Sequence, residues 1–416
     1  MVKNIQIYKG GFDARYGERV SAIIDITGKS GNKRKPAVYG GFNLISGNLT
    51  AELPLGDKMT LIAAGRTTYN SVYSTSLFKD FIEKQLPTKK TKNATILNTV
   101  KPEFRFYDYN TKISYLISDK QKLTMTTYGS KDYLNTKNYS SKNRLNINTL
   151  DNNEWRNYGF SSSWLRQWKS GIYSRLVMGY SGYSNDYYNK TDISKELQDP
   201  KHKPYLPEKN NTFETKESNQ LDDFSVSIKN SYQWKEKHHI DFGALVRRNE
   251  YLFYKDADNQ FVYSDKREKA WLQSVFFQDD YSPIPEVSIK PGLRFNYFNR
   301  TNKIYAEPRF SVNYQPVKFL LLKAAAGKYF QYLNKVATTE EYGYNRDFWV
   351  LSDGKRHPVV SSNHWIGGIN FTFNDFLIDI ETYYKTTDGV QKYFFISPYL
   401  RHSDFQYYFP TDSTKP

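Results

Sequence analysis

The chain has 416 residues, a formal net charge of +16 at pH 7 and no cysteine. The absence of cysteine excludes disulfide bonds, thiolate metal sites and cysteine nucleophiles. Aromatic residues make up 17% of the chain, with 36 tyrosines, whereas the mean hydropathy is only −0.74. This combination is unusual for a soluble α/β enzyme. No apolar run reaches the roughly 18 residues that a transmembrane helix needs, so helical membrane spans are excluded.

The first distinctive stretch runs from Ile5 to Lys29. It predicts a strand, a glycine turn at residues 10–11, a second turn at residues 16–17, and a strand with apolar residues at alternate positions from 20 to 26. Glycines at 10, 11 and 17 suit positions where φ is positive or where two backbones approach closely. We therefore expect a turn-rich segment ahead of the rest of the chain.

Beyond about residue 35 the chain alternates apolar and polar residues. Ile240, Phe242 and Ala244, for example, alternate with Asp241 and Gly243. The same period of two recurs in residues 224–234, 287–297, 306–314 and 376–381. Charged residues in these segments keep to one parity, which predicts strands with one apolar face and one polar face. A barrel in a membrane needs apolar residues only at alternate positions and carries belts of aromatic residues, so it accounts for the composition.

Short polar turns alternate with long polar stretches along this region. The turns lie near residues 57, 119, 170, 236, 284, 317 and 374, and the long stretches cover 70–103, 134–152, 187–217, 255–267, 332–363 and 389 onward. Short periplasmic turns and long extracellular loops are typical of an up-and-down membrane barrel, whose strands span the bilayer in about 9–11 residues. We count about fourteen strands, the first near 38–55 and the last near 375–388. Pro291 and Pro308 fall inside strands and are expected to form local bulges.

Patterns that indicate catalysis or cofactor binding are missing. The six histidines lack metal-ligand spacing, and no nucleophile elbow, phosphate loop or dinucleotide fingerprint is present. The aspartates near residue 257 lack the glycine and the bidentate glutamate of a calcium loop. Basic residues are scattered rather than grouped in a nucleic-acid-binding motif. We therefore expect no enzyme activity, no cofactor, no metal site and no nucleic-acid partner.

Three short motifs in the first stretch carry a family resemblance: Lys9-Gly10-Gly11-Phe12, Ala14-Arg15-Tyr16-Gly17 and Ile24-Asp25-Ile26. They resemble the end of the plug domain of TonB-dependent outer-membrane receptors. Residues 65–69, 307–311, 326–333 and 347–353 resemble segments of the barrel of the same family. The resemblance implies an all-β fold, with residues 1–34 as the C-terminal end of the plug and residues 35–416 as the N-terminal part of an antiparallel transmembrane barrel.

The resemblance also implies that the chain is a truncated piece. Family members have a signal peptide, a full plug and twenty-two strands, so about fourteen of twenty-two are expected here. The first residues lack a signal peptide, Met1 need not be the true start, and the last residues fall in an expected extracellular loop. An open sheet of this kind would leave two hydrogen-bonding edges unsatisfied in lipid.

The implied function is active import across the outer membrane of a Gram-negative bacterium. A solute would bind the extracellular loops, and the TonB protein, acting through the missing N-terminal region, would supply the energy. The solute could be an iron chelate, a glycan, a peptide or cobalamin, and the outer-membrane lipid would surround the barrel. The alternative is a passive porin or an adhesin-like barrel, for which the glycine-turned stretch before the barrel has no evident use.

Two groups of residues are candidates for functional sites. The first is the plug turn, which should face the barrel wall: Lys9, Gly10, Gly11, Arg15, Tyr16 and Gly17. Within it, Arg15 is expected to pair with a carboxylate of the lumen such as Glu307 or Glu381. The second group consists of loop aromatics that would form an extracellular lid or a merely structural cluster: Tyr342, Tyr344, Phe348 and Trp349.

Overall fold

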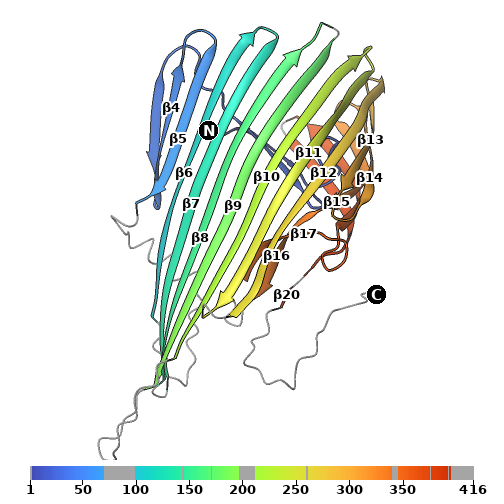
Figure 1. Cartoon of the computed structure of the whole chain (residues 1–416). Coiled ribbons are helices and arrows are strands. Elements are labelled where there is room, and N and C mark those ends of the chain that lie inside the picture. Colours follow the sequence, from blue (N-terminus) through green and yellow to red (C-terminus); the bar gives the residue numbers. More distant parts are fainter. Residues whose placement is uncertain are drawn as a thin grey trace, which may run out of the picture.

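The computed structural model describes residues 2–69, 99–142, 145–169, 171–195, 211–258, 261–339, 345–374, 376–391 and 393–394. In these residues the regular structure is β, and none of them belongs to a helix long and apolar enough to cross a membrane. They form one large sheet of fifteen strands and two small sheets of two and three strands. The large sheet is strongly curved, and its strands run steeply from one end of the molecule to the other (Figure 1).

The large sheet is an antiparallel meander, because each strand pairs with its neighbours along the chain. Its strands are β3 (Ala37–Phe42), β4 (Ser46–Pro54), β5 (Met59–Thr68), β6 (Thr99–Ser118), β7 (Gln121–Lys142), β8 (Leu145–Gln167), β9 (Ile172–Lys195), β10 (Asn211–Trp234), β11 (His238–Ala257), β12 (Phe261–Ile284), β13 (Val287–Phe298), β14 (Lys303–Val317), β15 (Leu320–Gln331), β18 (Val360–Phe373) and β19 (Phe376–Asp388). Among the described strands, only the step from β15 to β18 skips elements. In the described part of the chain, β3 and β19 are the two open edges. The expected all-β, up-and-down topology is thus confirmed.

The strand count is fifteen in the described residues, against about fourteen expected. Residues 38–55, expected as one strand, form the hairpin of β3 and β4. Its turn is held by the side chain of Asn43, whose Oδ1 accepts the backbone N–H groups of Ile45 at 3.0 Å and Ser46 at 2.8 Å. Asparagine side chains often bind nearby backbone N–H groups in turns in this way. This turn lies inside residues 38–55, which look like one continuous strand in the sequence.

Several strands are much longer than a membrane span. The strands from β6 to β12 have 20 to 24 residues each. The polar stretches 134–152 and 255–267 were expected to be loops, and this expectation is wrong, because their described residues continue the paired strands almost to the tips. Above a bilayer both faces of a strand meet water, so the alternation of apolar and polar residues disappears while the backbone pairing continues.

The two faces of the sheet differ in the way expected for a membrane barrel. On β12, Val275 and Phe277 point outward and are each 53% exposed, whereas Ser274 and Gln278 point inward and are each 3% exposed. An apolar outer face and a polar, buried inner face are the reverse of a soluble protein. The outer face is therefore the lipid-facing side, and the inner face is where polar contacts concentrate.

Pro291 and Pro308 were expected to form bulges, but neither of them does. The pairing of β13 with β14 runs without a register shift through both Pro291 and Pro308. Pro308 lies instead where the pairing of β14 with β15 has ended, one residue beyond the pair Arg309–Gly327. Pro291 lies in a gap of the pairing between β12 and β13, which is interrupted after Gln278–Gly292 and resumes at Tyr281–Ile289. Proline lacks an N–H to donate, so it suits such a position. We call the unpaired boundary beyond Arg309 and Gly327 the β14–β15 seam.

Candidate contact site between the N-terminal segment and the sheet

Residues 2–34 form a segment that lies against the inner face of the large sheet (dark blue in Figure 1). We call it the inner segment. Its strands β1 (Val2–Tyr8) and β2 (Ile23–Gly28) pair with each other and are largely exposed. Its most buried side chains, Phe12 and Ala14, belong to the turn between the two strands. The turn is therefore the part of the inner segment that is fixed to the wall.

Arg309 on β14 is at the centre of this attachment. Its Nη1 donates hydrogen bonds to three carbonyl oxygens of the turn, those of Phe12 at 3.2 Å, Asp13, and Tyr16 at 2.6 Å. Its Nη2 donates to the Glu307 carboxylate at 2.5 Å. A guanidinium can do this because its five N–H donors lie in a rigid plane. One buried cation thus binds the backbone of the turn and a carboxylate at the same time.

Glu307 also binds a backbone N–H group at the β14–β15 seam. It is fully buried, and its Oε1 accepts the backbone N–H of Phe330 at 3.0 Å. The pairing of β14 with β15 has already ended at this level, so this N–H would otherwise lack a partner. The same carboxylate therefore links Arg309 to the neighbouring strand.

Further wall side chains bind the backbone of the inner segment in the same manner. Carbonyl oxygens accept from His364 (Val20 O, 2.8 Å), Lys385 (Lys9 O, and Ser21 O at 3.1 Å), Lys112 (Gly28 O, 3.1 Å) and Thr60 (Ser30 O, 2.5 Å). In the opposite sense, the N–H of Ala14 donates to Gln278 Oε1 at 2.7 Å. Most of these wall groups are donors aimed at carbonyls, so the wall recognises mainly the path of the backbone.

Charge pairs reinforce the backbone contacts at two points. Glu18, which is buried, pairs with Arg247 and lies 3.7 Å from Arg294. The backbone of Glu18 has a φ of 66°, in the left-handed region that costs a non-glycine residue about 1 kcal/mol or more. Two arginines on β11 and β13 hold the carboxylate in place, which explains how this conformation persists. Asp13 lies 3.8 Å from Lys290 of β13 and adds a weaker pair.

An aromatic contact fills the space beside Arg309. The Phe12 ring lies 4.4 Å from the ring of Tyr329, and the guanidinium of Arg309 lies 5.1 Å from the first ring and 4.6 Å from the second. Phe12 and Tyr329 are essentially fully buried. Phe12 belongs to the motif Lys9-Gly10-Gly11-Phe12 but was not among the residues expected to contact the wall. A large apolar residue directly after a glycine pair is the signal that could have marked it.

The three expected turn glycines all approach the wall. A Cβ on Gly10 would come within 2.7 Å of Ile366, on Gly11 within 2.9 Å of Ala325, and on Gly17 within 2.3 Å of Arg294. Gly11 also has a positive φ of 60°. A side chain at any of these positions would require the turn or the contacted wall side chain to shift.

The remaining residues of the expected turn contact the wall less directly. Lys9 and Tyr16 use their backbone carbonyls, while the Tyr16 hydroxyl donates to Asp25 at 2.7 Å inside the segment. Burial, together with this hydrogen bond, raises the pKa of Tyr16 above its ordinary value. The phenol therefore stays neutral at physiological pH.

The expected partner of Arg15 is wrong. Arg15 pairs with Asp13 of its own turn at 3.2 Å and lies over the Tyr16 ring. Glu307 is occupied by Arg309, which projects from the same face of the same strand two positions away. Glu381 lies 3.9 Å from Lys323 of the neighbouring wall. Both carboxylates thus already have cations of the wall as partners.

The expected aromatic lid falls in a small inward-packed hairpin. Its strands are β16 (Leu333–Thr339) and β17 (Asn345–Leu351), and β20 (Tyr393–Phe394) pairs in parallel with β16. Tyr342 and Tyr344 lie outside the described residues. Phe348 is buried and stacks on Phe253 of β11 at 5.1 Å, and Trp349 meets Tyr183 of β9 edge-on at 6.4 Å. These two rings pack on the wall; ligand binding by them stays a prediction.

Asn219 of β10 clamps this hairpin to the wall. Its Oδ1 accepts the N–H of Trp349 at 2.9 Å, and its Nδ2 donates to the Trp349 carbonyl at 3.5 Å and to the Leu252 carbonyl at 3.3 Å. The side-chain amide thereby takes the place of a neighbouring strand. Elsewhere, the described residues contain no group of three or more His, Asp or Glu arranged to hold a metal ion.

No protein-family model and no curated protein sequence matches this chain. Solved structures do match it. They include a mutant form of the ferric enterobactin receptor PfeA from Pseudomonas aeruginosa, 14% identical with a TM-score of 0.61, over 93% of this chain and 58% of that one. The siderophore receptor PirA from Acinetobacter baumannii is 12% identical with a TM-score of 0.57, over 93% and 57%. The outer-membrane transporter YddB from Escherichia coli is 11% identical with a TM-score of 0.55, over 90% and 54%.

These likenesses concern the fold, because the identities are low. The chain spans between 54% and 58% of the length of these three proteins. The matches cover nine-tenths or more of this chain. The resemblance seen in the sequence is thus confirmed at the level of architecture: the chain has the fold of part of the outer-membrane receptors and transporters named above.

Proposed function

We propose that this chain is the end of the plug and part of the barrel of an outer-membrane receptor, which binds a solute on its extracellular side and imports it with energy from the TonB protein. The observation that carries the proposal is the inner segment held along the inner face of the sheet by Arg309, Glu18 and the carbonyl contacts around them. A passive porin or an adhesin has no need for such an occupant. An importer needs one, because the occupant keeps the lumen closed until it moves.

The contacts suggest how the inner segment would be released. Its exposed end, β1, has few contacts with the wall, whereas the turn at residues 9–22 is bound by buried charges. Hydrogen bonds to charged groups contribute about 1.5–3 kcal/mol each. A force applied to the N-terminal side would therefore meet its main resistance at the turn. This is the point at which externally supplied energy is needed.

The class of solute is the least constrained part of the proposal. Two of the similar structures are named as receptors for siderophores, one of them for ferric enterobactin. The net charge of +16 suits an anionic ligand. We therefore place ferric siderophores first, ahead of glycans, peptides and cobalamin.

Growth and uptake measurements test this function. Cells that lack the intact gene should fail to grow when an anionic ferric siderophore is the sole iron source, and expression of the intact gene should restore growth. Restored uptake should stop when the inner-membrane proton gradient is collapsed. Uptake that continues without the gradient, together with steady conductance of the purified protein in a planar bilayer, would favour the passive barrel instead.

A further inference from the structure

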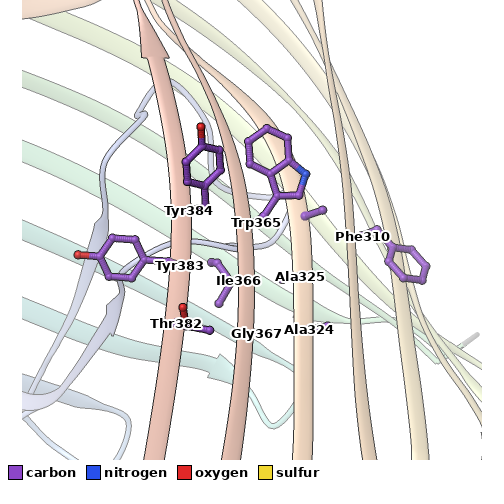
Figure 2. A pocket seen from close by; sticks show the side chains of 10 residues that line it. Phe310, Ala324, Ala325, Trp365, Ile366, Gly367, Thr382, Tyr383 and Tyr384 are labelled. Carbon is purple, nitrogen blue, oxygen red and sulfur yellow. The ribbon is translucent and has the colours of Figure 1, made fainter. Parts of the chain in front are cut away.

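An apolar groove lies on the outer face of the sheet, across β14, β15, β18 and β19 (Figure 2). Its volume is about 450 Å³. Its lining includes the small residues Ala324, Ala326 and Gly367. The larger side chains Phe310, Trp365 and Tyr384 also line it (Figure 2). The register places Phe310, Ala326, Trp365 and Tyr384 in one row across the four strands.

The groove faces away from the lumen. Ala325 and Ile366, which alternate with the small lining residues, are the residues that meet Gly10 and Gly11 of the inner segment. Successive side chains of a strand point to opposite faces, so the small lining residues point outward. The exposure of Phe310, which is 50%, agrees with this orientation. The groove is therefore open to whatever surrounds the barrel.

A row of polar side chains borders the groove on the side of the long loops. Lys328 occupies the next outward position of β15 after Ala326, and the register pairs it with Asn363 of β18, which pairs with Thr386 of β19. Lys328 is exposed and points outward, because Tyr329 beside it is buried against Phe12. On the opposite side of the groove the outward row is apolar: Leu322, Ile369 and Ile380. The site thus has one polar end and one apolar end.

Lys328 differs from several basic residues at outward positions of other strands. Arg105, Lys131, Arg156, Arg248 and Lys269 each form an ion pair with a glutamate. Among the described residues Lys328 has no carboxylate partner, and its ammonium lies 5.3 Å from the Phe330 ring. A lysine on the lipid face costs from about 0–1 kcal/mol near the interface to about 2–4 kcal/mol at the midplane. An anion bound beside it would lower that cost.

We propose that this groove binds a phosphorylated, multiply acylated lipid of the outer leaflet. Its phosphate is bound by the ammonium of Lys328 with the side chains of Asn363 and Thr386, and one acyl chain occupies the groove between Phe310 and Trp365. The outer leaflet is the relevant one because the polar row lies on the side of the long loops, which are extracellular in membrane barrels. The inference rests on the proposed outer-membrane location, and it goes beyond solute import.

Lipid retention by the purified full chain in detergent micelles tests this site. The probes are lipid A, dephosphorylated lipid A and phosphatidylethanolamine, and the bound fraction is read by native mass spectrometry. Lys328→Gln removes the cation, and Gly367→Leu fills the groove. Lys269→Gln is the matched control, because it removes an outward lysine that is paired with Glu250. The far-ultraviolet spectrum of each variant verifies that the strands are retained.

We expect the unmodified chain to retain lipid A at least about tenfold better than Lys328→Gln does, as the loss of a charge-assisted hydrogen bond implies. Gly367→Leu should weaken retention of both forms of lipid A, and Lys269→Gln should change neither. Equal retention by Lys328→Gln and the unmodified chain, or equal retention of phosphatidylethanolamine and lipid A, would overturn the proposal. The growth assay tests the import function separately. Preference for lipid A without solute uptake would contradict the import function and support this lipid site. Solute uptake without a preference for lipid A would support the import function and contradict this lipid site.

Discussion

Replacing Arg309 by glutamine should loosen the inner segment more than any other single change in the wall. The substitution removes the donor that binds the carbonyls of Phe12, Asp13 and Tyr16, and it leaves the buried Glu307 without its cation. Breaking a buried ion pair costs about 3–5 kcal/mol. Taking about 3 kcal/mol for release of the turn, the open population should rise about 100-fold.

Hydrogen exchange measures this opening directly. The N–H groups of Ala14 and Tyr16 are both bonded in the closed state, to Gln278 Oε1 at 2.7 Å and to the Asp13 carbonyl at 3.0 Å. Their exchange rates follow the open population of the turn. Both should therefore exchange about 100-fold faster in Arg309→Gln, while amides in the middle of β8 and β9 keep their rates.

Two further variants separate the contributions. Adding Glu307→Gln removes the unpaired carboxylate, so part of the lost thermal stability should return while the turn amides still exchange fast. Arg300→Gln is the matched control, because Arg300 bonds Glu268 and the Ser352 carbonyl without touching the inner segment. Turn amides that accelerate less than about threefold in Arg309→Gln, or as much in the control, would refute the reasoning.

Three other changes probe neighbouring features. Gly17→Ala places a Cβ within 2.3 Å of Arg294, so it should weaken the binding of the turn by about 1–3 kcal/mol and speed tryptic cleavage after residue 15. The control Gly65→Ala, whose Cβ meets nothing closer than 3.9 Å, should leave the rate of cleavage unchanged. Asn219→Ala removes the clamp on Trp349 and should free the β16–β17 hairpin, read as faster exchange of that amide; unchanged exchange would contradict the clamp. The folded pKa of Tyr16 is raised above its unfolded value near 10, so its contribution to the free energy of unfolding should be complete below pH 10 and decline above it. This decline should be smaller in Tyr16→Phe. Identical profiles of stability against pH for the variant and the unmodified chain would argue against this contribution.

The sequence predicts the membrane strands well because the bilayer imposes a simple physical rule on them. A lipid-facing position must be apolar, so Val275 and Phe277 stand out against Ser274 and Gln278. The short turns follow from the same rule, since polar residues return only at the interface. The turn of the inner segment is also marked in advance by its glycines at 10, 11 and 17, where a Cβ would approach the wall too closely unless the wall side chain shifted.

Features beyond the lipid are harder to predict. Strands that continue into water lose the alternation that identifies them, so residues 134–152 resemble a loop in sequence. The partner of Arg15 depends on which cation lies nearest to Glu307. Arg309 does, because it projects from the same face of the same strand, and Arg15 pairs with Asp13 instead. The inward packing of Phe348 depends on Phe253, almost a hundred residues away, and no local pattern encodes that contact.

The central claim is that the inner segment lies against β13 and must move for import. Because the chain has no cysteine, the double variant Ala14→Cys and Gly292→Cys introduces a single pair, at positions where the added Cβ on residue 292 would be 3.1 Å from the Cβ of Ala14. Built into the intact receptor, the pair should form a disulfide in the outer membrane that abolishes solute uptake, and a reductant should restore uptake. A disulfide that forms in full while uptake continues would contradict the account.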